Sequence, residues 1–194
     1  METKGLNIIL ASGSPRRQRF FEEMDIPFSI KVIPVVEEFP DNLKGAEIAQ
    51  HIVKQKAAPF QDLVKDNELI ITADTIVWNK NQCLGKPVDA KNAMQLLLSL
   101  SNTTHQVITA VGFLQKHKWE CIHEISEVTF GPLSETEIQN YIETGSPMDK
   151  AGAYGIQDSF GTLNIRSVSG SYTNIIGLPV TQVLEKIKEI IQVQ

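Results

Sequence analysis

The sequence predicts a mixed α/β fold in a single domain covering residues 1–194, and three observations lead to this prediction. Apolar runs typical of strands alternate with amphipathic helical stretches along the chain. Two expected strands in the middle of the chain follow one another without a helix between them, so the sheet is mixed rather than wholly parallel. The 194 residues, 42% of them hydrophobic, contain no repeat, low-complexity tract or linker that would divide them.

The expected strands are apolar or alternating runs bounded by polar turn residues. The run 69–78 is either one bent strand or two strands with Asp74 in the middle, and the polar residues 79–82 then form a turn. Strands are expected over 6–10, 28–33, 69–78, 106–114, 120–130 and 163–168.

The expected helices have apolar residues at helical spacing and recognisable ends. Ser14 and Pro15 suit the N-cap and the first position of the first helix. Asp89 suits the cap of another, and the segment 134–137 has the pattern of a capping box, with Gly145 closing the helix that follows. Helices are expected over 16–24, 45–64, 90–100, 135–144 and 179–191.

Charge and composition exclude several classes of protein. The net charge of −5 argues against a broad basic face for long nucleic acid. No apolar run reaches the roughly 18 residues of a membrane span, and the start of the chain lacks a signal-peptide pattern, so we expect a cytoplasmic protein that does not bind membranes. Cys83 and Cys121 lack metal-site spacing, so neither a disulfide framework nor structural zinc is indicated. Any anionic ligand must be held locally.

The segment Ser12-Gly13-Ser14-Pro15-Arg16-Arg17 lies between an expected strand and an expected helix. Two arginines in the first turn of a helix oppose the helix dipole unless an anion lies between them. Free N–H groups, small residues and guanidinium groups all suit a phosphate. The alternative is an ordinary turn with two solvated arginines. The P-loop pattern GxxxxGK[ST] is absent.

Further charged positions stand out along the chain. Lys56 shares the apolar face of its expected helix, so its side chain either snorkels at the edge of that face or points into a cleft. Asp74 lies in so apolar a setting that its carboxylate needs a partner, unless it is a turn or capping residue. Glu37 and Glu38 are either metal-directed carboxylates or a solvent-facing acidic pair.

With Lys86 in an expected turn, the candidates comprise two arginines, two lysines and three carboxylates. Such a set suits a polyphosphate bound with a divalent cation such as Mg2+, which takes oxygen ligands and bridges phosphates. His105 is a candidate base, although a single histidine before a strand is usually structural, and neither cysteine has an activating context.

The chain resembles the Maf family, the septum-formation-inhibitor-like nucleotide pyrophosphatases, over nearly its whole length. The resemblance rests on five ordered blocks: 10–17, 73–75 with 85–87, 105–109, 149–157, and 170–172 with 177–179. It implies a mixed α/β fold similar to that of the inosine-triphosphate pyrophosphatases, with two lobes and a central cleft. It also implies a homodimer, hydrolysis of a nucleoside triphosphate to its monophosphate and pyrophosphate, and Asp74 as the proton acceptor.

Substrate specificity in this family is associated with positions equivalent to Arg16, Thr75 and Gln157. The segment 151–157 resembles the branch that acts on dTTP and UTP, rather than the branch that prefers 7-methyl-GTP. A glutamine amide offers a donor and an acceptor, which match the carbonyl and N–H edge shared by uracil and thymine. Asp158 departs from the family pattern, in which glycine is commoner, and this departure bears on the loop near the base.

We therefore expect a house-cleaning pyrophosphatase for dTTP and UTP, with modified pyrimidine nucleotides as further candidates. The alternatives are a pyrophosphatase that prefers 7-methyl-GTP or other purine nucleotides, and a non-enzymatic regulator of cell division that acts through a protein partner. The expected triphosphate ligands are Arg16, Arg17, Lys56 and Lys86, with further donors from Ser12 and Ser14.

The expected catalytic centre combines carboxylates with a metal. Asp74 together with Glu37 or Glu38 is expected to hold Mg2+ or Mn2+. Asp74 then activates or orients a water for in-line attack on the α-phosphorus, while the cations stabilise the charge on the leaving pyrophosphate.

Overall fold

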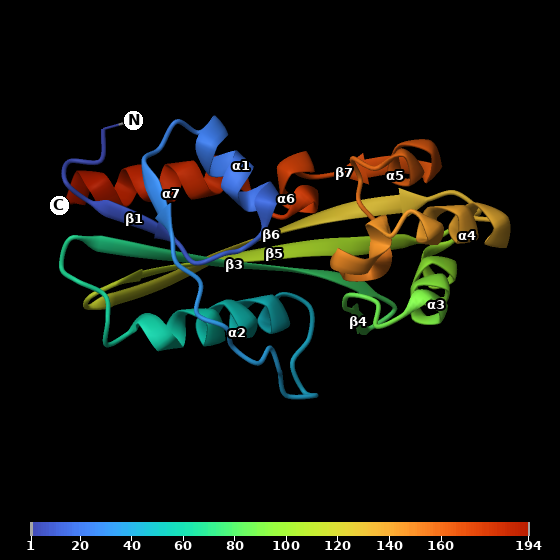
Figure 1. Cartoon of the computed structure of the whole chain (residues 1–194), viewed down its shortest axis with the longest axis horizontal. Helices are drawn as coiled ribbons and strands as arrows, with labels where there is room; N and C mark the ends of the chain where they lie inside the picture. Colours follow the sequence, from blue (N-terminus) through green and yellow to red (C-terminus); the bar gives the residue numbers. More distant parts are fainter. Residues whose placement is uncertain (1, 194) are drawn as a thin grey trace. The chain divides into compact units, whose positions relative to one another are not determined.

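A computed structural model describes residues 2–193 of the chain (Figure 1). One mixed sheet has the strand order β2-β1-β3-β5-β6-β7, with β4 paired to β3. The strands are β1 (Asn7–Leu10), β2 (Phe28–Ile30), β3 (Glu68–Asn79), β4 (Gln82–Leu84), β5 (Thr104–Gln115), β6 (Lys118–Phe130) and β7 (Ile165–Ser169). The α-helices are α1 (Pro15–Glu23), α2 (Ala46–Ala57), α3 (Ala90–Leu100), α4 (Glu135–Glu143), α5 (Ser159–Asn164), α6 (Tyr172–Ile176) and α7 (Val180–Val193), and the 3-10 turns are η1 (Ala58–Phe60), η2 (Ser146–Asp149) and η3 (Ala151–Ala153).

The strand directions confirm the mixed α/β class. β1 runs parallel to both β2 and β3, with Leu10 opposite Ile30 and Ile71. The pairs β3–β4 and β6–β7 are antiparallel. The turn between β3 and β4 has positive φ at Lys80 and Asn81, the geometry of a tight hairpin whose twist matches the strands.

The chain forms two compact units, each assembled from segments that are separate in the sequence. Unit 1 takes the described residues up to Asp74, Thr109–Glu124 and the described residues from Gly177 onward. Unit 2 takes Thr75–Ile108 and Ile125–Ile176. The single domain and the cleft expected from the sequence remain predictions.

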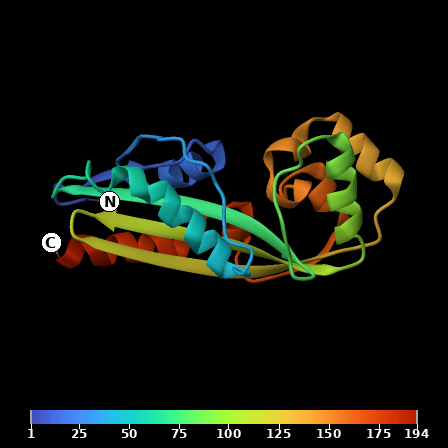
Figure 2. The same ribbon diagram turned by 90° about the horizontal axis from the view of Figure 1, so that it is seen from below.

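Unit 1 is a sheet covered by helices on both faces (Figures 1 and 2). On β3, Leu69 and Ile71 pack with residues of α1 and α7, whereas Ile70 packs with the end of α2 and with η1. This division follows from the alternation of side chains along a strand, which sends neighbouring residues to opposite faces. The near-continuous apolar run of β3 in the sequence therefore indicates a strand buried on both sides.

Unit 2 has a separate apolar core. It is formed by α3, α4, Val77 of β3, Val128 and Phe130 of β6, and the aromatic residues Tyr154 and Phe160. His105 lies inside this core, with its Nε2 atom 2.6 Å from the hydroxyl oxygen of Tyr154 and its ring stacked on Phe130. The structure therefore gives His105 a buried position rather than that of an exposed base.

The burial of His105 predicts a pH-dependent stability. Burial lowers the pKa of His105 to about 4, so the unfolded chain binds more protons than the folded chain between about pH 4 and 6.5. Stability from this group is therefore complete above pH 6.5 and falls as the pH drops, by about 2 kcal/mol between pH 7 and pH 5. When the pH falls from 7 to 5, the free energy of unfolding measured in urea should decrease less for His105→Phe than for the wild type. The exposed His117, changed to Phe, serves as the control, and an equal pH dependence of all three proteins would contradict the prediction.

Most elements confirm the sequence predictions, and three of the expected boundaries are wrong. The strand expected over 163–168 begins only at Ile165, because the two residues before it belong to α5. The helix expected over 45–64 ends at Ala57, because Pro59 has no N–H to continue the hydrogen-bond ladder and the chain tightens into η1. The strand expected over 28–33 ends at Ile30. The loop-rich region after Gly145 contains the short helices α5 and α6, which the sequence did not indicate. No helix within residues 2–193 is long and apolar enough to cross a membrane.

Candidate functional site

The parallel strands of unit 1 bring three segments together. β1 pairs with both β2 and β3 in parallel register. Ala11, just after β1, donates its N–H to the carbonyl of Ile71 on β3, and Lys31, just after β2, donates to the carbonyl of Leu10. The loops after β1 and β2 therefore lie at the same edge of the sheet as the Thr72-Ala73-Asp74 stretch of β3. Parallel sheets commonly place ligand sites at this edge.

Asp74, Lys56 and Glu37 form an ion-paired group at this edge. The Lys56 ammonium lies 2.7 Å from Oδ1 of Asp74 and 3.1 Å from Oε1 of Glu37. The side chains of Lys56 and Asp74 are 17% and 12% exposed, whereas that of Glu37 is 48% exposed, so the group opens to solvent on the glutamate side. The carboxylate of Asp74 thus has the partner that its apolar setting required, and Lys56 points inward from its helix.

The two adjacent acidic residues of the loop have different roles. Glu37 contributes its side chain to Lys56, whereas Glu38 contributes its backbone carbonyl, which accepts a hydrogen bond of 2.8 Å from the Gln55 amide. Both contacts tie the loop to neighbouring residues of α2. The structure therefore brings Glu37 to Asp74 and leaves the Glu38 residue exposed.

Arg17 holds the backbone around this group. Its Nη1 donates to the carbonyl of Ala73 at 2.9 Å, and its Nε donates to the carbonyl of Gly177 at 2.9 Å. A third contact reaches Oγ of Ser12 at 3.5 Å. The guanidinium therefore joins the start of α1, the residue before Asp74 and the segment that leads into α7. Burial lowers the pKa of Arg17, and the nearby charges of Asp74 and Glu37 oppose this shift.

The Ser12–Ser14 turn presents the start of α1. The Oγ of Ser12 accepts a hydrogen bond of 3.3 Å from the Ser14 N–H, and its carbonyl accepts from the amide of Gln18 at 3.2 Å. Ser14 occupies the N-cap position as expected, but its hydroxyl makes no capping hydrogen bond to the described helix, whose first turn contains no acidic residue. The first turn, with Arg16 in it, therefore retains the positive end of a helix dipole.

The carboxylates of the site suit a divalent cation whose remaining ligands come from the substrate and water. Within residues 2–193, no group of three or more His, Cys, Asp or Glu side chains is arranged to hold a metal. Two carboxylates, Asp74 and Glu37, do converge on one cation, the Lys56 ammonium. Mg2+ is commonly bound by one or two carboxylates together with substrate phosphates and water. The donor set therefore suits Mg2+ or Mn2+ bound with a nucleotide, and the metal remains a prediction.

Unit 2 holds the remaining candidates, Thr75, Lys86 and Gln157. Gly152 donates its N–H to the carbonyl of Gly85, the neighbour of Lys86, at 3.0 Å. A Cβ added to Gly152 would lie 2.8 Å from Val77 of β3, so the loop packs directly on the strand that begins unit 2 with Thr75. Gln157 and Lys86 are exposed on segments that Gly152 ties together. The specificity roles of Thr75 and Gln157 and the triphosphate contact of Lys86 remain predictions.

The inward position of the Arg17 side chain and the hydrogen-bond network around Asp158 were not predicted from the sequence. Arg17 stands four residues before Phe21, which is fully buried, so the two share the inward face of α1, and this spacing could have separated Arg17 from Arg16. The hydrogen-bond group around Asp158, described below, joins residues far apart in the sequence. No local pattern indicates it.

Comparison with known protein families identifies the family of the chain. The sequence model of the family described as Maf-like protein matches residues 7–190. The chain belongs to the Maf family. The expected family membership is therefore confirmed over nearly the whole chain.

Several Maf family relatives are similar over almost their full lengths. The protein named dTTP/UTP pyrophosphatase from Flavobacterium johnsoniae is 48% identical over 182 residues, which cover 94% of each chain. The protein of the same name from Bacteroides fragilis is 42% identical over 184 residues, covering 94% of this chain and 95% of the relative. Among solved structures, the Staphylococcus aureus Ham1 protein is 13% identical with a TM-score of 0.47, over 64% of this chain and 71% of that one.

Proposed function

We propose that this chain hydrolyses dTTP and UTP to the nucleoside monophosphate and pyrophosphate. The observation that carries the proposal is the partly buried Asp74 carboxylate, which Lys56 holds at the edge where the arginine-rich start of α1 also lies. The names of the relatives from Flavobacterium johnsoniae and Bacteroides fragilis support the choice of nucleotide. Modified pyrimidine nucleotides with the same base edge belong to the proposed substrate class, in keeping with a house-cleaning role.

In the proposed reaction, Asp74 accepts a proton from the attacking water. The water oxygen forms a bond to the α-phosphorus, the bond between that phosphorus and the bridging oxygen breaks, and pyrophosphate leaves with the electron pair. Lys56 donates to Oδ1 of Asp74, so Oδ2 is the oxygen to which we assign the proton of the water. A positioned base of this kind contributes typically about 10²- to 10⁴-fold to the rate.

The cations of unit 1 supply the electrostatic part of the mechanism. Arg16 and the backbone N–H groups of the first turn of α1 bind the phosphate oxygens, because this turn combines a helix dipole with a guanidinium. Lys56 shields Asp74 from the triphosphate charge. Asp74 and Glu37 would hold Mg2+ or Mn2+, which when bound neutralises charge on the leaving pyrophosphate.

A panel of nucleotides tests the proposed activity. Pyrophosphate release should be fastest with UTP and dTTP in the presence of Mg2+ or Mn2+, and slower with ATP, GTP and 7-methyl-GTP. Equal rates with purine and pyrimidine triphosphates would overturn the pyrimidine assignment. Silence with every nucleotide would overturn the enzymatic proposal and favour a regulator acting through a protein partner.

Gln157→Glu tests whether the Gln157 amide recognises the pyrimidine base. The carboxylate keeps the acceptor for the base N–H but loses the donor for a carbonyl, so kcat/KM for UTP should fall about 10- to 100-fold, as expected when a polar group of the ligand is left unpaired. The change should raise KM more than it lowers kcat. Gln82→Glu adds the same charge at an exposed position of unit 2 and serves as the control. An equal loss with UTP and GTP in Gln157→Glu would indicate a general charge effect and contradict the assignment.

The proposal also covers the oligomeric state and the cellular location of the protein. We propose a cytoplasmic location and a homodimer, the latter because the family resemblance implies it. Light scattering coupled to size-exclusion chromatography measures the mass directly, and a mass equal to that of the 194-residue chain would contradict the dimer.

A further inference from the structure

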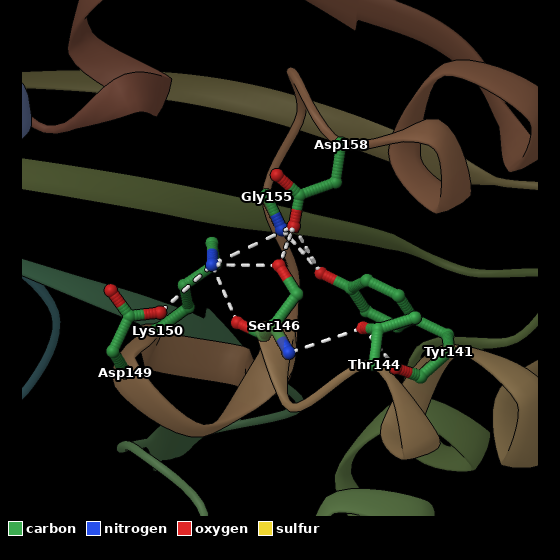
Figure 3. A network of polar contacts seen from close by, with 7 residues as sticks. All are labelled: Tyr141, Thr144, Ser146, Asp149, Lys150, Gly155 and Asp158. Carbon is green, nitrogen blue, oxygen red and sulfur yellow. Dashed lines mark hydrogen bonds and ion pairs between the residues drawn. The ribbon is translucent and has the colours of Figure 1, made fainter.

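Asp158, the residue after Gln157, is the centre of a polar network in unit 2 (Figure 3). One carboxylate oxygen, Oδ2, accepts hydrogen bonds from the Tyr141 hydroxyl at 2.5 Å and from the Ser146 hydroxyl at 2.8 Å. The Lys150 ammonium lies 3.6 Å from the same oxygen. Helix α4, turn η2 and the Gln157 loop therefore meet at a single atom.

The network also grips the backbone of the loop. The N–H of Gly155 donates to the Tyr141 hydroxyl oxygen at 3.3 Å, so Tyr141 links the loop to Asp158. Lys150 donates to the Ser146 carbonyl, to the Ser146 hydroxyl and to Asp149. The Lys150 side chain is 10% exposed and that of Asp158 is 17% exposed, and water therefore has limited access to the charges that hold these segments. Polar groups buried in this way are costly to leave unpaired, so the network favours one loop conformation.

Close contacts at two glycines restrict the backbone conformation of the loop. A Cβ at Gly155 would lie 2.9 Å from the carboxyl carbon of Asp158, so the carboxylate rests directly on the loop backbone. A Cβ at Gly161 of α5 would lie 2.3 Å from the Gly155 carbonyl and 2.9 Å from Cα of Ile156. Backbone approaches of this kind require glycine and define the path of the chain up to Gln157.

The position of Asp158 argues against a purely local role. Asp158 occupies the N-cap position of α5, where an aspartate normally accepts a hydrogen bond from the first turn. Its side chain makes no such bond to the described helix and turns instead to Tyr141 and Ser146. The carboxylate therefore does not cap α5, and its hydrogen bonds instead attach the loop to α4 and η2.

We propose that Asp158 is a positioning residue that holds the exposed Gln157 amide in one orientation and thereby determines selectivity for pyrimidine bases. This inference rests on the proposed function for the identity of the substrate. Gln157 is exposed while its neighbours Gly155 and Asp158 are fixed, so the loop presents the amide from a rigid frame. A rigid amide discriminates between base edges, because a base of the wrong pattern leaves its polar groups unpaired.

Asp158→Asn tests the proposal with two independent readouts. Amide hydrogen exchange in residues 151–158 should become about tenfold faster, because the loop opens locally without the carboxylate. For UTP, kcat/KM should fall about tenfold, mainly through KM, while kcat/KM for GTP changes little. Tyr141→Phe removes the hydroxyl that donates to Asp158 and accepts from Gly155, but Asp158 keeps its contacts with Ser146 and Lys150, so both quantities should shift in the same direction and to a smaller extent. This second variant keeps the test available if Asp158→Asn does not fold.

Glu120→Gln is the matched control. Glu120 of β6 pairs with Lys186 at 2.6 Å and Lys118 at 2.8 Å in unit 1, so the change also removes a doubly paired carboxylate. It should leave loop exchange and the ratio of UTP to GTP activity unchanged. Unchanged loop exchange in Asp158→Asn overturns the positioning role, and equal losses with UTP and GTP overturn the role in selectivity. If the wild type releases pyrophosphate from no nucleotide, the proposed function and the selectivity role fail, while hydrogen exchange still decides whether Asp158 positions the loop.

Discussion

Asp74→Asn should lower kcat for pyrophosphate release from UTP by about 10²- to 10⁴-fold, the typical contribution of a positioned general base. Asparagine has nearly the same shape and still accepts the hydrogen bond from Lys56, but its amide cannot take a proton from water. KM and the dissociation constant for UTP should stay close to those of the wild type, because the phosphate-binding residues are unchanged. Initial rates measured with a pyrophosphate-coupled assay, together with calorimetric titration of UTP, provide these quantities.

The exposed Asp62 of unit 1 offers a matched control for this change. Asp62→Asn alters the net charge by the same amount, so a general electrostatic effect on the triphosphate would appear in both variants. Wild-type turnover by Asp74→Asn would contradict its role as the base. A loss that occurs only in KM would instead place Asp74 among the groups that bind the substrate.

The local elements of the fold were predictable because their causes are local. The capping box at Ser134 and Glu137 forms with both reciprocal hydrogen bonds, and Asp89 caps α3 by accepting from the N–H of Asn92. These interactions depend on residues three apart, which a sequence pattern can contain. Ser171 likewise accepts a hydrogen bond from the N–H of Asn174 at the start of α6, whereas α5 has no side-chain cap, and packing in the core of unit 2 contributes to forming both short helices.

The site was predictable as a set of charged residues but not as an arrangement. Lys56 stood out because it shares the apolar face of its helix, and Asp74 because of its apolar run, and the structure pairs them at 2.7 Å. Which glutamate joins them is decided by the backbone of the loop, which sends the Glu37 side chain to Lys56 while the carbonyl of Glu38 bonds to Gln55. No pattern in the sequence defines that backbone path.

Arg17 is the residue whose environment differs most from the sequence-based expectation. It was expected to bind the triphosphate together with Arg16, since both lie in the first turn of a helix. In the structure, its guanidinium donates to the carbonyls of Ala73 and Gly177, both of which belong to buried residues. These contacts give Arg17 a structural role. Any binding of phosphate by Arg17 would be a second role beside it.

Arg17→Met should therefore reduce both stability and catalysis. Methionine fills part of the volume but leaves two buried carbonyls without their donor, at a cost of about 1–3 kcal/mol each. We expect the free energy of unfolding in urea to fall by about 2–6 kcal/mol. Because the Ala73 carbonyl immediately precedes Asp74, displacement of this backbone should also lower kcat, by about 100-fold for a shift near 1 Å.

Arg19→Met separates this effect from the loss of a positive charge on α1. Arg19 lies two residues further along the same helix, pairs with Glu23 at 2.8 Å and is 78% exposed, so its removal should change stability by less than about 1 kcal/mol. A variant that retains wild-type stability and loses only affinity for UTP would identify Arg17 as a phosphate ligand alone. A joint loss of stability and kcat in Arg17→Met, absent from Arg19→Met, would instead show that Arg17 supports the backbone that carries Asp74, because only that backbone connects folding to the proposed proton acceptor.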